Sequence, residues 1–411
     1  FENGGYIYKM NASDRRPVKV DVTLAADNIY ARSEVKNVSD YVSSVSVSHD
    51  GARLAVTARG EVFDVPATKG VTRNITRSAG AHERDAEFSP DGKHIAYISD
   101  ASGESEIWMQ PSEGGDPVQM TKNNGAYIRT IMWSPDSKKI AYIDMRNRIN
   151  LLDVASKRVE KLVEDPAGEP RGFNFSPDGN WLTYTRTADN EFSIVYVYNI
   201  AQKKEYPVTD KWYSSSSPAF SEDGKYIMFS SQRDFNPVYG SMEWNHIDTS
   251  MGAPYNAIHS KDTPSPLLGK DPQVNEKKEE PKKDDAKKDG ESAVTVNIDI
   301  ERLADRIVRL PVGTGRYYNF YGNNDRIYYY SGGKTKVFNL KTQKEDEVAD
   351  GMMFVAPGNK KAIISNRNKS YVVDVPSGKA SLGDQVDLSN MVATVDYAEE
   401  WPQIFNEAWR I

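Results

Sequence analysis

Short stretches in which apolar and polar residues alternate recur along the whole chain, and this alternation predicts β-strands. Residues 94–98, His-Ile-Ala-Tyr-Ile, form one such stretch. A run that ends in a bulky apolar residue precedes each of these strands, and two further strand-like runs follow it, as at 106–109 and 117–120. A period of two is typical of strands in antiparallel sheets. The pattern therefore predicts a repeating unit of four strands.

A tetrapeptide of the type Ser-Pro-Asp-Gly marks the same point in each unit. Its first five copies follow one another at steps of 41, 45, 42 and 45 residues and begin at Ser48, Ser89, Ser134, Ser176 and Ser221. Proline presets φ at the first corner of a tight turn, aspartate can bond local amides, and glycine adopts a positive φ. The tetrapeptide therefore predicts a hairpin turn between the first and second strands of each unit. Four strands in roughly 40 to 45 residues is the size of a propeller blade.

Two degenerate units, which turn at 323–325 and 357–359, bring the set to seven. The predicted fold class is all-β, a seven-bladed β-propeller of four-stranded antiparallel blades with its Ser-Pro-Asp-Gly turns on one face. An insertion at about 262–292 interrupts the fifth unit. Its middle, 270–292, is rich in Lys, Glu and Asp and has almost no apolar residues, so it cannot offset the entropy of ordering. We interpret it as a disordered loop, with a charge-patterned docking arm as the alternative.

The two ends of the chain do not follow the repeat. Residues 6–10 and 17–20 match the third and fourth strands of a blade without the first two. We therefore interpret 1–30 as the trailing strands of a preceding propeller, rather than as strands that close this ring, and assign 31–396 to the propeller. Residues 397–411 change to helical spacing and predict the start of a helical core domain. Their apolar stripe consists of Trp401, Ile404, Phe405, Ala408 and Trp409.

Composition narrows the class of partner. The 411 residues carry a formal net charge of −7, whereas nucleic acid and anionic membranes both require a dominant basic face. The chain also lacks an apolar run of the roughly 18 residues that span a bilayer. Neither nucleic-acid binding nor membrane insertion is therefore expected. The absence of cysteine excludes disulfides, thiolate metal sites and a cysteine nucleophile, but it says little about the cellular compartment.

Several residues look catalytic or metal-binding in isolation, and each has a structural interpretation. Ser331-Gly332-Gly333 resembles the edge of a protease nucleophile motif, yet a glycine pair between two strands predicts a hairpin turn. The turn aspartates cannot form a calcium loop, which needs several carboxylates within about a dozen residues. The histidines occupy unrelated places in the repeat, so spacing predicts neither a catalytic triad nor a metal site, and we interpret them as surface or loop residues. They are His49, His82, His94, His246 and His259. No cofactor and no metal are expected.

One constellation does stand out from the repeat. An arginine occurs five residues before the turn serine in three successive blades, as Arg84, Arg129 and Arg171. Residues at the same position of the repeat occupy equivalent places in successive blades. These side chains should therefore form an arc near one mouth of the central channel. The planar guanidinium fork suits carboxylates, including the C-terminus of a peptide. The alternative is that each arginine pairs with an acid of a neighbouring blade, for example Glu83 or Asp85.

Three further segments carry a resemblance to a known family. They are residues 61–66 (Glu-Val-Phe-Asp-Val-Pro) with 72–76, residues 230–237 (Ser-Ser-Gln-Arg-Asp-Phe-Asn-Pro), and residues 403–409 (Gln-Ile-Phe-Asn-Glu-Ala-Trp). Together with the repeat they resemble tricorn proteases over nearly the whole chain. The resemblance implies that a six-bladed propeller precedes this seven-bladed one, and that helical core domains and a PDZ domain follow. It also implies that the catalytic residues lie in those core domains, so this chain itself is expected not to be an enzyme.

Three functions are compatible with these features. The first is a non-catalytic propeller that gates or channels peptide substrates to the protease domains of the same polypeptide, as the resemblance implies. Its partners would be peptide substrates and the other domains of the same protein. The expected compartment is the cytoplasm, with the periplasm as the alternative. The full-length protein could form an oligomer. The second is a TolB-like propeller that docks a partner protein. The third, an independent propeller hydrolase, is disfavoured because no nucleophile and base are placed together.

Overall fold

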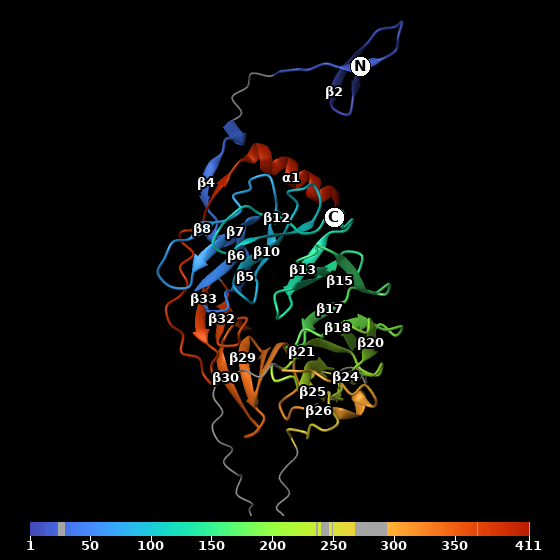
Figure 1. Cartoon of the computed structure of the whole chain (residues 1–411), viewed down its shortest axis with the longest axis vertical. Helices are drawn as coiled ribbons and strands as arrows, with labels where there is room; N and C mark the ends of the chain where they lie inside the picture. Colours follow the sequence, from blue (N-terminus) through green and yellow to red (C-terminus); the bar gives the residue numbers. More distant parts are fainter. Residues whose placement is uncertain are drawn as a thin grey trace, which may run out of the picture.

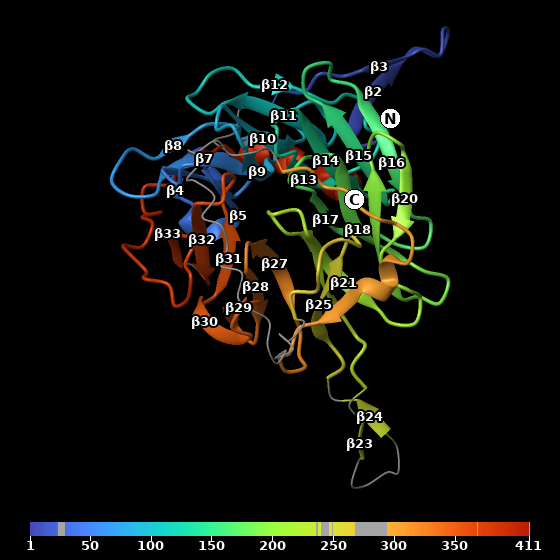
Figure 2. The same cartoon turned by 60° about the horizontal axis from the view of Figure 1, so that its bottom comes forward.

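Seven antiparallel sheets surround a common centre in the computed structural model of the chain, as Figure 2 shows for the strands nearest that centre. The structure describes residues 1–23, 29–235, 237–239, 246–248, 250–267, 294–367 and 369–410. Each sheet is one blade, and the blades follow one another around the ring in chain order. The predicted blade number and the all-β fold class are confirmed.

The strands fall into four concentric positions. The inner strands are β5 (Val42–Val47), β9 (Arg84–Phe88), β13 (Ile128–Trp133), β17 (Arg171–Phe175), β21 (Ser215–Phe220), β27 (Tyr318–Asn323) and β31 (Met352–Val355). The second strands are β6 (Arg53–Ala58), β10 (His94–Ser99), β14 (Lys139–Asp144), β18 (Trp181–Thr187), β22 (Tyr226–Ser231), β28 (Arg326–Ser331) and β32 (Lys361–Asn366). The third strands are β7 (Glu61–Pro66), β11 (Glu106–Pro111), β15 (Arg148–Asp153), β19 (Ser193–Asn199), β25 (Ala253–Ile258), β29 (Lys334–Asn339) and β33 (Lys369–Asp374). The outer strands are β8 (Arg73–Asn74), β12 (Val118–Gln119), β16 (Val159–Glu164), β20 (Lys204–Pro207), β26 (Ile307–Arg309) and β30 (Lys344–Asp350).

The seventh blade differs from the expected four strands, because its sheet contains only β31, β32 and β33 among the described residues. The segment after β33 contains Pro376, Gly378 and Gly383 and no alternating run, so it cannot form a regular outer strand. It crosses the open edge irregularly, with one backbone bond from the Val386 N–H to the Ser370 carbonyl (2.9 Å).

The Ser-Pro-Asp-Gly turns have one shared hydrogen-bond pattern, which confirms their structural role. In the second blade the Ser89 hydroxyl donates to Asp91 Oδ1 (2.6 Å), and the Lys93 N–H donates to the same oxygen (3.1 Å). The His94 N–H then donates to the serine oxygen (3.0 Å). The same serine-to-aspartate bond occurs at Asp50, Asp136, Asp178 and Asp223.

The turns gather on one face of the ring, which we call the turn-side face. The Asp91 N–H of one turn donates to Ser137 Oγ of the next (3.0 Å). Ser137 occupies the position held by glycine in four other copies, and it adopts the same positive φ, 60°. The His49 ring likewise lies against Gly92 of the following turn.

The hydrophobic core is divided among the seven contacts between neighbouring blades. The bulky residue before each turn serine packs toward the preceding blade. Phe175, for example, shares a cluster with Ala141, Ile143 and Leu151 of the third blade. Side-chain bonds to the backbone of neighbouring inner strands add to this packing. Asn174 Oδ1 accepts from the Phe220 N–H (3.0 Å), and Asp85 Oδ2 accepts from the Ile131 N–H (2.9 Å).

The fifth blade contains two long connections. A hairpin of β23 (Pro237–Tyr239) and β24 (His246–Asp248) separates β22 from β25, and it extends away from the ring in Figure 2. The second connection joins β25 to β26 and includes the segment predicted to be a disordered loop. Residues 268–293 of that segment lie outside the described residues, and a short 3-10 helix, Leu303–Arg306, precedes β26.

The ring closes where the two ends of the propeller meet. Strand β4 (Glu34–Asn37) pairs antiparallel with β34 (Val392–Val395), and one apolar cluster joins the first blade to the seventh.

Residues near the N-terminus form a separate sheet of β1 (Glu2–Asn3), β2 (Tyr6–Met10) and β3 (Pro17–Lys19), which pairs with no described propeller strand (Figure 1). Helix α1 (Tyr397–Arg410) forms in the segment with helical spacing. No helix within the described residues is long and apolar enough to cross a membrane.

Candidate functional site

A cavity of about 720 Å³ lies at the centre of the ring toward the turn-side face. All seven inner strands or their turns contribute to its wall, and we call it the central cavity. Much of the wall is aromatic or proline, because the residues around each turn converge there. These residues include Phe88, Pro90, Trp133, Pro135, Phe175, Pro177, Phe220, Phe320, Tyr321, Phe354 and Pro357.

Most polar side chains in this wall are already used to join blades. Ser46 Oγ accepts from the Phe88 N–H (3.3 Å), and Asn319 Nδ2 donates to the Met353 carbonyl (2.7 Å). Asn359 Nδ2 donates to Glu222 Oε2 (2.8 Å), which links the turns of the seventh and fifth blades. These bonds therefore join different blades across the wall of the cavity.

Two carboxyl groups line the central cavity, Glu87 of the second blade and Glu222 of the fifth. Burial raises the pKa of Glu87 well above its usual value, the nearby Asp85 carboxyl raises it further, and the Trp133 backbone N–H only partly offsets this. Burial also raises the pKa of Glu222, against the bond from Asn359. Among the described residues, no Lys, Arg or His forms an ion pair with either carboxylate.

The three arginines predicted as a substrate path lie in the first two positions of inner strands, on the face opposite the turns. Arg129 Nε lies 3.2 Å from Glu169 Oε1, and Arg171 Nε lies 3.8 Å from Oε2 of the same residue. The structure thus brings these two together at one carboxylate. The Arg171 side chain is 79% exposed, whereas that of Arg129 is 41% exposed.

Arg84 is placed differently from the other two arginines. Its guanidinium lies 4.0 Å from the centre of the Tyr127 ring, and Nη2 donates to the Ile128 carbonyl (3.1 Å). The acids expected as alternative partners, Glu83 and Asp85, form ion pairs with none of the three arginines, because both bond hydroxyl groups instead. Arg84 is therefore a contact between the second and third blades.

Helix α1 lies over the first three blades on the face opposite the turns, which we call the helix-side face (Figure 1). Its polar side contacts the propeller. Arg59 Nη2 donates to both oxygens of Glu400 (2.7 and 3.0 Å), and Arg410 Nη2 donates to Asp100 Oδ2 (3.1 Å). Within the apolar stripe, Phe405 and Trp409 point away from the propeller and are 72% and 86% exposed, whereas Ile404 borders the propeller.

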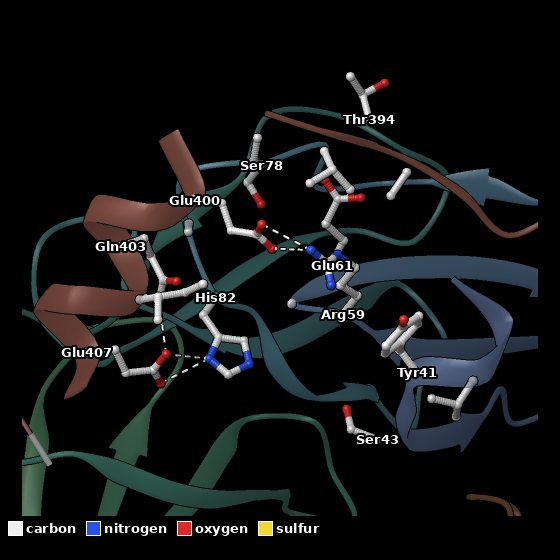
Figure 3. Close-up of a pocket in the computed structure, with 17 residues that line it drawn as sticks. Tyr41, Ser43, Arg59, Glu61, Ser78, His82, Thr394, Glu400, Gln403 and Glu407 are labelled. Atoms are coloured by element: carbon white, nitrogen blue, oxygen red, sulfur yellow. Dashed lines mark hydrogen bonds and ion pairs between the residues drawn. The ribbon is translucent and has the colours of Figure 1, made fainter. Parts of the chain in front are cut away.

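A second cavity, of about 410 Å³, lies beneath α1 and is drawn in Figure 3. His82 Nδ1 is 2.8 and 2.9 Å from the two carboxylate oxygens of Glu407, and the Tyr127 hydroxyl donates to Glu407 as well. Burial alone would raise the pKa of Glu407, but the bonds from Gln403, His82 and Tyr127 outweigh it and lower the pKa. The repeat does not predict this cluster. The only sequence signal was the polar stripe of Glu400, Gln403 and Glu407 opposite the apolar one.

Two buried acids lie between the first and second blades near this cavity. Glu83 is 2% exposed, and burial raises its pKa to about 7 although it accepts bonds from Ser78 and Ser99. Glu61, 5% exposed, accepts from Asn74 Nδ2, and burial raises its pKa too.

The residues that looked catalytic in the sequence have structural positions. Ser331 pairs with Lys334 across a two-residue turn at Gly332 and Gly333, both with positive φ, so the predicted hairpin is confirmed. His259 is an exception to the surface interpretation, because it is 2% exposed and burial lowers its pKa. Within the described part of the chain, no group of three or more His, Asp or Glu side chains could hold a metal ion.

Seven blades around a central cavity define this protein as a seven-bladed β-propeller. The family model of the "Tricorn protease second beta propeller domain" matches residues 42–376. The chain therefore belongs to the tricorn protease second β-propeller domain family.

Relatives and solved structures agree with this family. "Tricorn protease homolog 1" of Streptomyces coelicolor is 26% identical over all of this chain, and the "Putative Tricorn-like protease C-terminal subunit" of Sulfurisphaera tokodaii is 24% identical. The structure titled "Crystal structure of the tricorn protease" matches 99% of this chain with a TM-score of 0.77 at 16% identity, which shows the shared fold. The chain spans 41% and 47% of the lengths of these two relatives and 40% of the solved chain.

Proposed function

We propose that this propeller channels peptide substrates toward protease domains located elsewhere in the same polypeptide. The observation that carries the proposal is the central cavity, enclosed by all seven blades in a chain of a protease propeller family. Because the opening is bounded by a ring of packed blades, its size limits passage to extended or unfolded peptides. The tricorn names of the relatives supply the substrate class.

The domain organisation belongs to the same proposal. Residues 1–30 would be the end of a preceding propeller, 31–396 the channel-forming ring, and 397–411 the start of a helical core domain. The exposed apolar stripe of α1 supports the last assignment, since apolar surface of this kind is usually covered in a complete protein. The compartment proposed for the full-length protein is the cytoplasm.

A blocked channel tests the proposal directly. The chain contains no cysteine, so Met132→Cys in the cavity wall provides a single site in this propeller for a bulky maleimide. We expect labelling of the full-length protein, freed of other cysteines, to reduce cleavage of long peptides at least about 5-fold. Cleavage of a short fluorogenic substrate should change less than about 2-fold. Glu113→Cys, on an exposed loop, is the matched control. Equal long-peptide cleavage before and after labelling at position 132 would contradict channelling.

Arg129 and Arg171 are proposed to guide peptide carboxylates at the helix-side mouth. Glu169 already neutralises part of their charge, and exposed pairs are weak individually, so the effect requires both. The double change to glutamine should slow cleavage of peptides with a free C-terminal carboxylate, with little effect on C-terminally amidated ones. Arg84→Gln, tested alone and with the other two, controls for loss of blade packing. Unchanged turnover with all three replaced would show that the arginines only join blades.

The hydrolytic chemistry is proposed to lie outside this chain. The isolated 411-residue chain should therefore hydrolyse no peptide or ester substrate. Activity that Ser331→Ala abolishes would refute this assignment.

A partner-docking propeller is the second candidate. It is favoured by Trp212 and Phe235, which are 80% and 77% exposed at loops of the fourth and fifth blades. Replacing both with serine should then weaken a stable complex with another protein while channelling is unaffected.

A further inference from the structure

We propose that the central cavity contains a binding site for one cationic group of a peptide, either a lysine or arginine side chain or an amino terminus. The inference rests on the proposed passage of peptides and adds the chemistry that the passage selects. It is carried by two carboxyl groups, Glu87 and Glu222, in a wall formed by all seven blades.

The placement of the two glutamates is the first step. Glu87 lies two residues before the turn serine of the second blade, and Glu222 lies in the turn of the fifth. In a ring of seven, blades separated by three positions face each other across the centre. A chain in the cavity would therefore pass between the two carboxyl groups.

The second step is the hydrogen-bond capacity that remains unused. Ser46 and Asn174 occupy, in their blades, the position that Glu87 occupies in the second, and both accept backbone N–H groups of the next blade. Glu87 likewise interacts with the Trp133 backbone N–H of the next blade, but it has no ion-pair partner among the described residues, and Glu222 uses only Oε2, toward Asn359. The only charged side chains among the described residues of the wall are these two carboxyl groups, and a ligand with several donors and a positive charge satisfies them best.

The third step concerns the cost of enclosing these groups. A carboxylate that is partly shielded from water and has no cation beside it is unfavourable, as the raised pKa of Glu87 reflects. An ammonium or guanidinium group would restore the missing partner and convert this cost into binding. The aromatic side chains of Trp133 and Tyr321 in the same wall can also contact a cation. An anionic side chain would instead be repelled by the two carboxyl groups.

Peptide binding to the 411-residue chain tests the inference. Fluorescence anisotropy compares labelled decapeptides that are acetylated and amidated and differ only at a central lysine, norleucine or glutamate. A fourth peptide has a free amino terminus and central norleucine, which separates the terminal amine from the side chain as the source of charge. We expect the lysine peptide, the free-amine peptide or both to bind on the order of 10-fold more tightly than capped norleucine.

Two variants locate the site. Glu87→Gln combined with Glu222→Gln keeps the shape of both side chains and should bring the preference for the cationic peptides below about 2-fold. Glu113→Gln removes one exposed charge and should leave the preference intact. Equal binding of all four peptides, or a preference that survives the double change, would overturn the cationic site while leaving peptide channelling in place. Failure of every peptide to bind would also overturn the cationic site, whereas channelling is decided separately by labelling at position 132.

Discussion

Glu83 offers the sharpest test of the energetics of this propeller, because it is a carboxyl group enclosed between two blades. Its side chain is 2% exposed, with the Ser99 hydroxyl donating to Oε1 (2.8 Å) and the Ser78 hydroxyl to Oε2. The perturbation is Glu83→Gln. Glutamine keeps the size and the acceptor toward Ser99, and its amide can donate to the rotatable Ser78 hydroxyl.

The size of the effect on folding stability follows from the pKa of Glu83. Burial raises the pKa of Glu83 from 4.5 to about 7, so the folded protein favours the protonated form. The stability that this group contributes is fully present below pH 4.5 and is lost as the pH rises through about 7. At roughly 1.4 kcal/mol per pKa unit, the loss amounts to roughly 3 kcal/mol. With an unfolding entropy of ~2.1 cal/mol/K per residue, this corresponds to about 3 to 4 °C in Tm.

Thermal unfolding of wild type and Glu83→Gln at several pH values between 4.5 and 8 is the assay. In the variant, the Tm should not show the decrease that Glu83 causes as the pH rises. The difference in Tm between variant and wild type should therefore grow by about 3 to 4 °C across the range. Glu113→Gln, which removes an exposed carboxylate, should follow wild type. Parallel curves for wild type and Glu83→Gln would refute the reasoning, because they would mean that Glu83 is charged in the folded protein at no cost.

Three further predictions concern the helix, the turns and the core. Glu407→Ala removes the contact with His82, so amide hydrogen exchange in residues 397–410 should accelerate about 3-fold or more, while propeller strands are unaffected. Asp91→Ala deletes two acceptor bonds in one turn and should lower the unfolding free energy by about 1 to 2 kcal/mol in urea titrations, whereas Asp91→Asn should cost less. Phe175→Ala leaves a cavity between the third and fourth blades and should cost about 3 to 5 kcal/mol by the same measurement.

The blade number and the turns could be predicted because their causes are local. Every bond that defines the second turn joins atoms between Ser89 and His94, so six residues contain the whole signal. The helix α1 is equally local, since its spacing is visible in consecutive residues. The repeat predicts four strands in the seventh blade, whereas the structure has three. Pro376 and Gly378 prevent a regular outer strand, but they do not indicate what replaces it.

The contacts between blades were decided by the tertiary structure. The register of the repeat predicts Arg84, Arg129 and Arg171 at one mouth of the channel. That Arg129 and Arg171 share Glu169, and that neither pairs with Glu83 or Asp85, depends on how neighbouring blades pack. The meeting of His82 with Glu407 joins residues 325 positions apart, which no repeat can indicate. Sequence by itself thus determined the repeated blade and its turns, because those bonds lie within a few residues. Tertiary structure decided which charged groups are paired, buried or left facing the cavity, because those outcomes depend on contacts between distant segments.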